Sequence, residues 1–180
     1  MGLQEMYNNL CNTPSDINEH LPILNKYAQK CSHITEMGFR CGVSTYAFLA
    51  AKPNKLFSYD INYHESVEQV KKIAKTEGID FEFIHADVLK IDIEQTDFLF
   101  IDTWHTEMQL SKELELHSKK VKKYIGLHDT HTFGQMGEDG VPGHGLNYAI
   151  ISFIKNNPSW KEIYKTIINN GLTILEKQND

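Results

Sequence analysis

Two acidic residues of this chain, Asp102 and Asp129, each lie close to a histidine in the sequence and are candidates for a chemical role. Asp102 is followed three residues later by His105, and His128 and Asp129 are adjacent further along. Each pair comes at the end of an apolar run of strand character, and neighbouring parallel strands lie about 4.8 Å apart. The two carboxylates should therefore converge, and with few basic neighbours they need a cation or a proton to coexist. The pattern predicts a divalent metal site at Asp102 and Asp129.

A second chemical signal lies around residue 40, in the run Ile-Thr-Glu-Met-Gly-Phe-Arg-Cys-Gly-Val-Ser-Thr. It predicts a strand, a turn that contains Gly38 and Gly42, and a helix that begins near Ser44. The next strand ends at Asp60, so a helix N-terminus, two glycines and a carboxylate should surround one crevice of an open sheet. This arrangement is typical of a nucleoside-cofactor site. The alternative is that the glycines serve only a tight strand-to-helix turn.

The glycine spacing bears on which cofactor is favoured. A dinucleotide site requires G-x-G-x-x-G, whereas Glu36 here opens the pattern E-x-G-x-x-x-G-x-S, with one glycine fewer. A third acidic residue, Asp87, ends the strand-like run Phe-Ile-His-Ala-Asp. It is either a further cofactor contact or the N-cap of a short helix.

Strand-like and helix-like segments alternate along the chain with short connections, which is typical of an α/β fold. Strands are expected near 33–37, 56–60, 81–85, 97–102 and 123–128, and helices near 44–51, 65–77, 107–119 and 146–156. An Asn-Gly turn between the apolar runs 161–167 and 172–176 predicts a terminal antiparallel hairpin. We therefore expect a mostly parallel seven-stranded sheet with helices on both faces.

Composition sets limits on partners and organisation. The chain has 180 residues, of which 41% are hydrophobic and 23% charged, and this predicts a single domain over 1–180, with capping helices in 1–32 and a catalytic core in 33–176. The net charge of −6 and the single arginine, Arg40, argue against a nucleic-acid partner. No run resembles a membrane span or a secretory signal. We expect a cytoplasmic protein without a membrane partner, and homo-oligomers stay open.

The ordered motifs resemble those of class I S-adenosylmethionine (SAM) dependent methyltransferases. The likeness is greatest to the cephalosporin-hydroxylase-like, macrocin and catechol O-methyltransferase-like group, through I-D-x-x-H after the fourth strand and H-D-T after the fifth. It covers roughly residues 33–176 and implies a Rossmann-like methyltransferase sandwich. The resemblance implies that SAM is bound by Glu36, Gly38, Gly42, Ser44, Asp60 and Asp87. In the family, the acid after the second strand holds the ribose hydroxyls, and the acid after the third accepts from the adenine amino group.

The resemblance also implies a divalent ion, usually Mg²⁺, held by Asp102 and Asp129. Thr130 stands where catechol enzymes have an amide ligand, so the third ligand is either His128 or a water molecule. His105 stands where those enzymes keep a lysine, which makes it a candidate general base beside Asp102, or equally a metal ligand. Substrate contacts are expected from Trp104, Thr130, His131 and His144, the last two in or beside a glycine-rich loop that could cover the acceptor.

The sequence therefore predicts a SAM-dependent O-methyltransferase, assisted by a divalent metal, whose acceptor is a hydroxyl of a small polyhydroxylated molecule such as a sugar or a glycosylated metabolite. Two other classes stay open. One is a non-catalytic SAM-fold binding module, or a partner of a glycosyltransferase, which would bind without turnover. The other is an NAD(P)-dependent oxidoreductase, which would use Asp60 for a ribose but lacks the third glycine.

Overall fold

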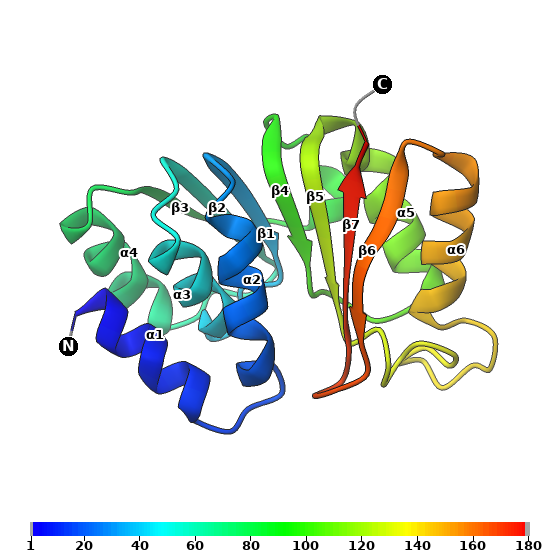
Figure 1. The fold of residues 1–180 in the computed structure, drawn as a ribbon, viewed down its shortest axis with the longest axis horizontal. Coiled ribbons are helices and arrows are strands. Elements are labelled where there is room, and N and C mark those ends of the chain that lie inside the picture. Colours follow the sequence, from blue (N-terminus) through cyan, green and yellow to red (C-terminus); the bar gives the residue numbers. More distant parts are fainter. Residues whose placement is uncertain (1, 179–180) are drawn as a thin grey trace.

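In the computed structural model, which describes residues 2–178, seven strands form one sheet in the order β3-β2-β1-β4-β5-β7-β6 (Figure 1). The strands are β1 (His33–Met37), β2 (Lys55–Asp60), β3 (Asp80–His85), β4 (Thr96–Ile101), β5 (Val121–His128), β6 (Trp160–Thr166) and β7 (Leu172–Lys177). Strands β1 to β5 are parallel, and β7 runs antiparallel between β5 and β6. The expected sheet and terminal hairpin are confirmed.

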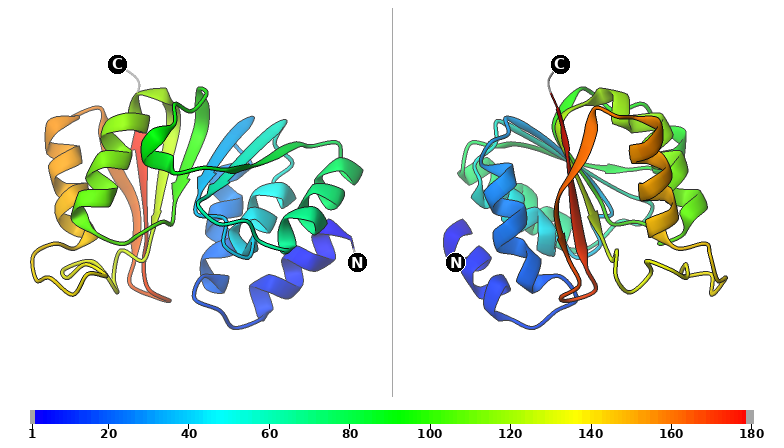
Figure 2. Two further views of the ribbon diagram at one scale, coloured as in Figure 1. Left: turned by 180° about the vertical axis from the view of Figure 1, so that it is seen from behind. Right: turned by 45° about the vertical axis from the view of Figure 1, so that its right-hand side comes forward.

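The helices form two layers, one on each face of the sheet (Figure 2). Alternate side chains of a strand point to opposite faces, so in β4 Phe98 and Phe100 pack toward one layer while Leu99 and Ile101 pack toward the other. The first layer contains α1 (Leu3–Asn12), α2 (Leu21–Ala28), α3 (Val43–Ala50) and α4 (Ser66–Thr76), and the second contains α5 (Glu107–His117) and α6 (Leu146–Asn156). The expected helices on both faces are confirmed.

Local sequence signals set where these helices lie. The apolar positions of α4 recur at helical spacing and bury Val67, Val70 and Ala74. Helix α5 begins after Thr106, whose hydroxyl accepts a hydrogen bond from the backbone N–H of Gln109. Short 3-10 turns, η1 (Asn18–His20), η2 (Val88–Lys90) and η3 (Ser118–Lys120), complete the connections.

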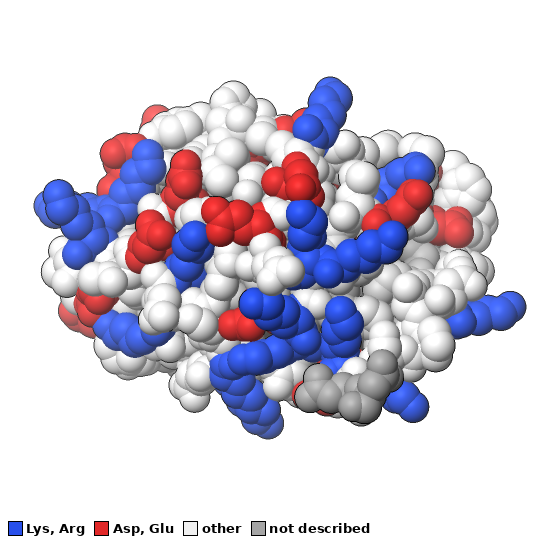
Figure 3. All heavy atoms as spheres, turned by 90° about the horizontal axis from the view of Figure 1, so that it is seen from above, with Lys and Arg blue, Asp and Glu red and all other residues white. Residues whose placement is uncertain are grey.

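The carboxyl ends of the parallel strands meet at one edge of the sheet, at the bottom of Figure 1, together with the loop over 129–145. This edge brings together the segments in which the sequence predicts chemistry. The opposite edge, seen in Figure 3, carries cationic and acidic side chains side by side. Among the described residues, no helix is both long enough and apolar enough to cross a membrane.

Candidate cofactor pocket and metal centre

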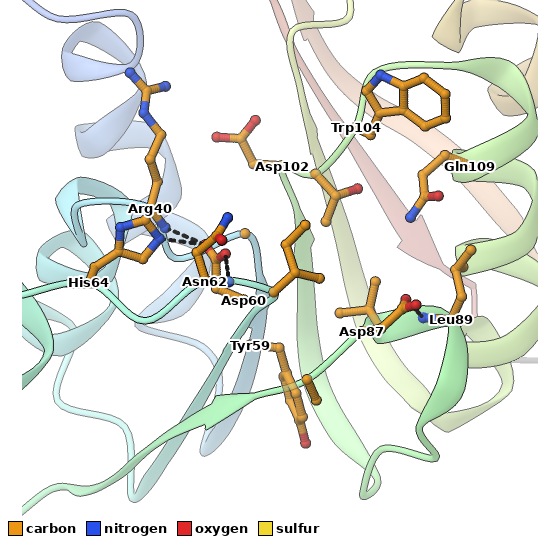
Figure 4. A pocket seen from close by; sticks show the side chains of 15 residues that line it. Arg40, Tyr59, Asp60, Asn62, His64, Asp87, Leu89, Asp102, Trp104 and Gln109 are labelled. Atoms are coloured by element: carbon orange, nitrogen blue, oxygen red, sulfur yellow. Dashed lines mark hydrogen bonds and ion pairs between the residues drawn. The ribbon is translucent and has the colours of Figure 1, made fainter.

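A pocket of about 500 Å³ opens at the carboxyl ends of the strands, and we call it the main pocket (Figure 4). Its walls include Gly38, Asp60, Asp87, Asp102 and Trp104, of which Asp60 ends β2 and the others come from the connections after β1, β3 and β4. In Figure 4, Asp60 and Asp87 face the pocket from different sides. Five of the residues that the sequence singles out for a cofactor, a metal or a substrate therefore share one cavity.

Asp60 is already engaged by the backbone around it. One carboxylate oxygen accepts a hydrogen bond from the N–H of Arg40 at 2.7 Å, and the other accepts from the N–H of Asn62 at 2.8 Å. The Nε2 atom of His64 lies 3.2 Å from the first oxygen. Each carboxylate oxygen has two lone-pair sites, so Asp60 holds the turn after β1 and can still accept from a ligand.

Asp87 is an N-cap, one of the two roles that the sequence leaves open, and it also lines the main pocket. It is the N-cap of η2, where its Oδ1 accepts from the N–H of Leu89 at 3.0 Å, and its Oδ2 lies 3.0 Å from Nζ of Lys90. The hydrogen bond from Leu89 and the pairing with Lys90 hold the pKa of Asp87 below its ordinary value. The residue is therefore an anionic hydrogen-bond acceptor in the pocket wall.

Gly38 and Gly42 are required by the backbone itself. Gly38 has a φ of +94°, and a Cβ atom at this position would lie 1.9 Å from the carbonyl oxygen of Asp102. Gly42 has a φ of +79° and is the N-cap of α3. Gly38 lines the main pocket, whereas Gly42 serves the strand-to-helix turn and does not line it.

Glu36 lies beneath this turn rather than in the wall of the main pocket. It is fully buried, and its carboxylate accepts hydrogen bonds from the hydroxyls of Ser44 (2.5 Å), Thr45 (2.7 Å) and Ser58 (2.5 Å). Burial raises the pKa of Glu36 to about 7 against the lowering effect of the three hydroxyl groups. Glu36 therefore joins β1, β2 and the first turn of α3, and Ser44 takes part in this buried network.

Asp102, His105, His128 and Asp129 form one group beside the main pocket, which we call the Asp–His cluster. Nε2 of His105 lies 3.2 Å from Oδ1 of Asp102 and 2.9 Å from Oδ2 of Asp129. Nδ1 of His128 lies 3.2 Å and 3.4 Å from the same two oxygens. Ligand atoms of Asp102, His128 and Asp129 all lie within 4.8 Å of one another, which suits a single metal ion. The sequence-based expectation that the two carboxylates converge is met.

The charges in the Asp–His cluster depend strongly on one another. Burial lowers the pKa of His105 and His128, but hydrogen bonds to Asp102 and Asp129 outweigh burial and raise both values to about 10. Burial in turn raises the pKa of the two carboxyls, and the rings hold both below the ordinary range. As an imidazolium, His105 cannot accept a proton. It can act as a base only when another cation neutralises the carboxylates.

His105 is held from outside the cluster as well. Its Nδ1 lies 2.9 Å from Oε2 of Glu138, whose carboxylate also accepts from the backbone N–H of His105 at 3.2 Å. The ring stacks on Phe133 with 4.9 Å between the centroids and 10° between the planes. Glu138 and Phe133 belong to the loop after β5, so this loop sets the orientation of the His105 ring.

No family model matches the sequence, and no curated protein matches it. Solved structures do match. An O-methyltransferase from Bacillus cereus in complex with S-adenosylhomocysteine (SAH) aligns over 98% of this chain and 90% of its own, with a TM-score of 0.67 and 16% identity. The SAH-bound methyltransferase PaMTH1 of Podospora anserina aligns over 98% and 88%, with a TM-score of 0.62 and 14% identity.

The chain has the class I methyltransferase fold. A third similar structure is the 1,6-didemethyltoxoflavin-N1-methyltransferase of Burkholderia thailandensis, which was solved with bound 1,6-didemethyltoxoflavin and SAH. It aligns over 92% of this chain and 79% of its own, with a TM-score of 0.65 and 11% identity. Because its name gives a nitrogen as the acceptor, the methyltransferase fold alone does not decide between oxygen and nitrogen.

The four residues expected to contact substrate lie in different surroundings. Trp104 is 47% exposed at the rim of the main pocket, so its side chain does not belong to the hydrophobic core. Thr130 is buried, and its hydroxyl accepts from that of Thr173 at 3.0 Å. His131 and His144 are exposed, and neither makes a hydrogen bond or ion pair with the Asp–His cluster within the described part of the chain.

A second buried carboxylate, that of Glu113 in α5, was given no role by the sequence analysis. Its Oε1 accepts from the hydroxyl of Thr103 at 2.6 Å and from the amide of Gln109 at 2.8 Å, and both of these residues line the main pocket. Burial raises the pKa of Glu113 to about 7. The available signal was an acidic residue beside Leu114 on the apolar face of the predicted helix.

Proposed function

We propose that this chain is a SAM-dependent O-methyltransferase in which a divalent ion assists the reaction. The observation that carries the proposal is that Gly38, Asp60 and Asp87 line one pocket whose wall also contains Asp102 of the Asp–His cluster. A cofactor in this pocket and an acceptor at the cluster would be neighbours. The similarity of the fold to SAH-bound methyltransferases supports the cofactor.

When bound, SAM supplies a methyl group on a positively charged sulfonium. The pocket volume of about 500 Å³ lies in the range of small-molecule and cofactor sites. In this proposal, Asp60 accepts hydrogen bonds from the ribose hydroxyls and Asp87 accepts from the adenine amino group. Gly38 leaves the backbone open at the pocket wall, and the carboxylate of Asp102 favours the positive charge.

A divalent ion, when bound, would supply a positive charge that lowers the pKa of an acceptor hydroxyl. Asp102, Asp129 and His128 are the residues that would hold it, since their donor atoms already lie within 4.8 Å of one another. Asp129 Oδ1 is buried and has no hydrogen-bond partner among the described residues, so it is free to bind. His105 then takes the acceptor proton at Nε2 once the charge of the two carboxylates is neutralised.

The acceptor that we propose is a hydroxyl of a small polyhydroxylated molecule such as a sugar or a glycosylated metabolite. Trp104 at the pocket rim offers an exposed aromatic surface for a sugar ring, and the exposed His131 and His144 lie on the loop side of the site. Thr130 is not part of this proposal, because its hydroxyl is used in the interior. The cytoplasmic location and the association of copies stay predictions.

The oxidoreductase alternative loses support from the fold. Dinucleotide-binding sheets of this kind follow the order 3-2-1-4-5-6, whereas here an antiparallel β7 lies between β5 and β6. The binding-module alternative keeps the pocket and differs only in lacking turnover. It is separated from the enzyme by an activity measurement.

Calorimetric titration with SAM, SAH and NAD⁺ is the first test of the proposal. Binding of both adenosyl ligands without NAD⁺ binding supports the cofactor, and the absence of adenosyl binding with and without divalent ions would overturn it. Methyl transfer to a panel of sugars and glycosides, followed by mass spectrometry, then tests the reaction. SAM binding without any transfer to hydroxylated acceptors would favour the binding module.

A further inference from the structure

We infer that the Asp–His cluster is a mixed nitrogen and oxygen metal centre that binds a transition metal ion, such as Zn²⁺, Co²⁺ or Fe²⁺, in preference to Mg²⁺. The inference deepens the proposed function and rests on its metal-assisted part. It departs from the magnesium ion that the sequence resemblance implies, because one of the three donors, Nδ1 of His128, is an imidazole nitrogen.

The donor atoms of Asp102, His128 and Asp129 have the spacing of one coordination sphere, because all three lie within 4.8 Å of one another; His105 is not part of this set. Nδ1 of His128 lies 3.2 Å from Oδ1 of Asp102 and 3.4 Å from Oδ2 of Asp129. Two donors bonded to one ion at about 2.1 Å lie roughly 3.0 Å apart at a right angle and roughly 3.4 Å apart at the tetrahedral angle.

Burial and missing partners supply the second observation. His128 is 2% exposed and Asp129 is 8% exposed, and the Oδ1 atom of Asp129 has no hydrogen-bond partner in the part of the chain that the structure describes. Buried carboxylate oxygens are ordinarily paired, so an orphaned one calls for an explanation such as an ion. Within residues 2–178, Asp102 and Asp129 make ion pairs with the two imidazoles and with no lysine or arginine.

The types of donor decide which ion fits. Mg²⁺ is a hard cation that takes oxygen ligands and keeps several of its waters, whereas imidazole suits zinc, iron, nickel and copper. Among the three donors, Nδ1 of His128 is an imidazole nitrogen directed at the carboxylates of Asp102 and Asp129. A centre with this donor set should therefore discriminate against Mg²⁺.

The surroundings of His105 hold its ring beside the three metal donors and leave its Nε2 available as the base. A carboxylate that accepts the second ring N–H of a histidine fixes the tautomer and the direction of the ring. Nδ1 of His105 lies 2.9 Å from Oε2 of Glu138, and Phe133 stacks on the ring face. Glu138 is therefore a positioning residue that keeps Nε2 of His105 directed at the cluster.

The test uses the full chain after removal of metal by a chelator. Titration with Zn²⁺, Co²⁺, Mn²⁺ and Mg²⁺ should show one site that binds Zn²⁺ or Co²⁺ at least roughly 100-fold more tightly than Mg²⁺. The bound Co²⁺ should show visible absorption bands, and bound Mn²⁺ should show couplings to ¹⁴N by electron spin echo. Equal or tighter binding of Mg²⁺, or Mn²⁺ without nitrogen couplings, would overturn the inference. These spectra need no variant, so a failure of a variant to fold leaves the test intact.

Variants locate the site. His128→Asn should abolish the preference over Mg²⁺, because it removes the one imidazole among the three donors. Asp139→Asn, beside Glu138 on the same loop, and His33→Asn, at the other end of the sheet, are matched controls that should leave binding unchanged. If the controls weaken binding as much as His128→Asn, the metal lies elsewhere and the inference fails.

SAM titration of the same samples separates this inference from the proposed function. SAM binding together with no preference for a transition metal would overturn the metal inference alone. A selective metal centre in a protein that does not bind SAM would overturn the proposed methyltransferase and leave the metal inference standing.

Discussion

Asp60 holds a turn and faces the main pocket, so its two roles must be separated by experiment. Asp60→Asn removes the negative charge that the proposed ribose contacts need, and hydrogen bonds to charged groups contribute about 1.5–3 kcal/mol. We expect SAM to bind at least about 10-fold more weakly, as measured by calorimetry.

The matched control for Asp60 is Asp97. Its carboxylate also accepts from two backbone N–H groups, those of Ser32 at 2.7 Å and His33 at 3.3 Å, but at the opposite end of the sheet. Asp97→Asn should leave SAM binding unchanged. Equal losses in both variants would mean that Asp60 acts only through the stability of the backbone.

At the level of single residues, the sequence predicted positions better than partners. Asp60, Asp87 and Asp102 follow directly from strand ends, because parallel strands deliver their carboxyl ends to one edge. The contact between His105 and Glu138 spans 33 residues and depends on the path of a loop that has no periodic pattern. Such contacts become visible only once the chain is folded.

At the scale of the elements, β1, β2 and α3 meet at one buried titratable group, the carboxyl of Glu36. The folded-state pKa of Glu36 is about 7, above its ordinary value of 4.5, so the folded chain binds this proton more tightly than the unfolded chain. The free energy of unfolding should therefore fall as the pH rises from 4.5 to 7 and change little above that. The contribution of one such group is on the order of 3 kcal/mol.

Urea denaturation at pH 5 and pH 8 measures this effect. Glu36→Gln cannot titrate and should show a smaller fall in the free energy of unfolding between the two pH values than the unmodified chain. Glu113→Gln should act in the same direction, because the pKa of Glu113 is also raised to about 7. An unchanged fall in the Glu36 variant would show that its carboxyl ionises in the folded protein near the ordinary pH.

The β6–β7 turn requires glycine at position 171 both for its backbone conformation and for lack of space for a side chain. Gly171 has a φ of +94°, and an added Cβ would lie 2.4 Å from the backbone nitrogen of His131, which itself donates to the carbonyl of Asn170. Gly78 has a φ of +71° with nothing within 4 Å of an added Cβ. Alanine in place of Gly78 should cost about 1 kcal/mol of unfolding free energy, from backbone strain alone.

Alanine in place of Gly171 should lower the free energy of unfolding by at least about 2 kcal/mol, because a steric clash with backbone atoms adds to the same conformational strain. Denaturation of the two variants in parallel isolates the clash. Equal losses would show that the loop after β5 moves freely away from the hairpin.

The Asn-Gly pair located this turn correctly in the sequence, yet it could not indicate that the turn forms hydrogen bonds with the loop after β5. The backbone N–H groups of His131 and Thr132 both donate to the carbonyl of Asn170. The strands, the helices and the terminal hairpin followed from local pattern, whereas the contacts between loops depend on the assembled sheet.

For the molecule as a whole, Asp102 links the two candidate sites. It lines the main pocket and belongs to the Asp–His cluster, and its carbonyl oxygen closely approaches Gly38. A ligand in the pocket and an ion at the cluster therefore act on the same carboxylate. The two binding events should be coupled, and thermodynamic linkage requires that each changes the other by the same factor.

The sign of this coupling follows from charge. The sulfonium of SAM is positive and the sulfur of SAH is neutral, so a divalent ion that neutralises Asp102 should weaken SAM binding relative to SAH binding by roughly 5-fold or more. Calorimetry of both ligands with and without saturating Co²⁺ measures the effect. His128→Asn, which lies outside the lining of the main pocket, should remove the difference by removing the ion. If the ion changes SAM and SAH binding equally, Asp102 does not connect the two sites through its charge, and the pocket and the cluster act independently.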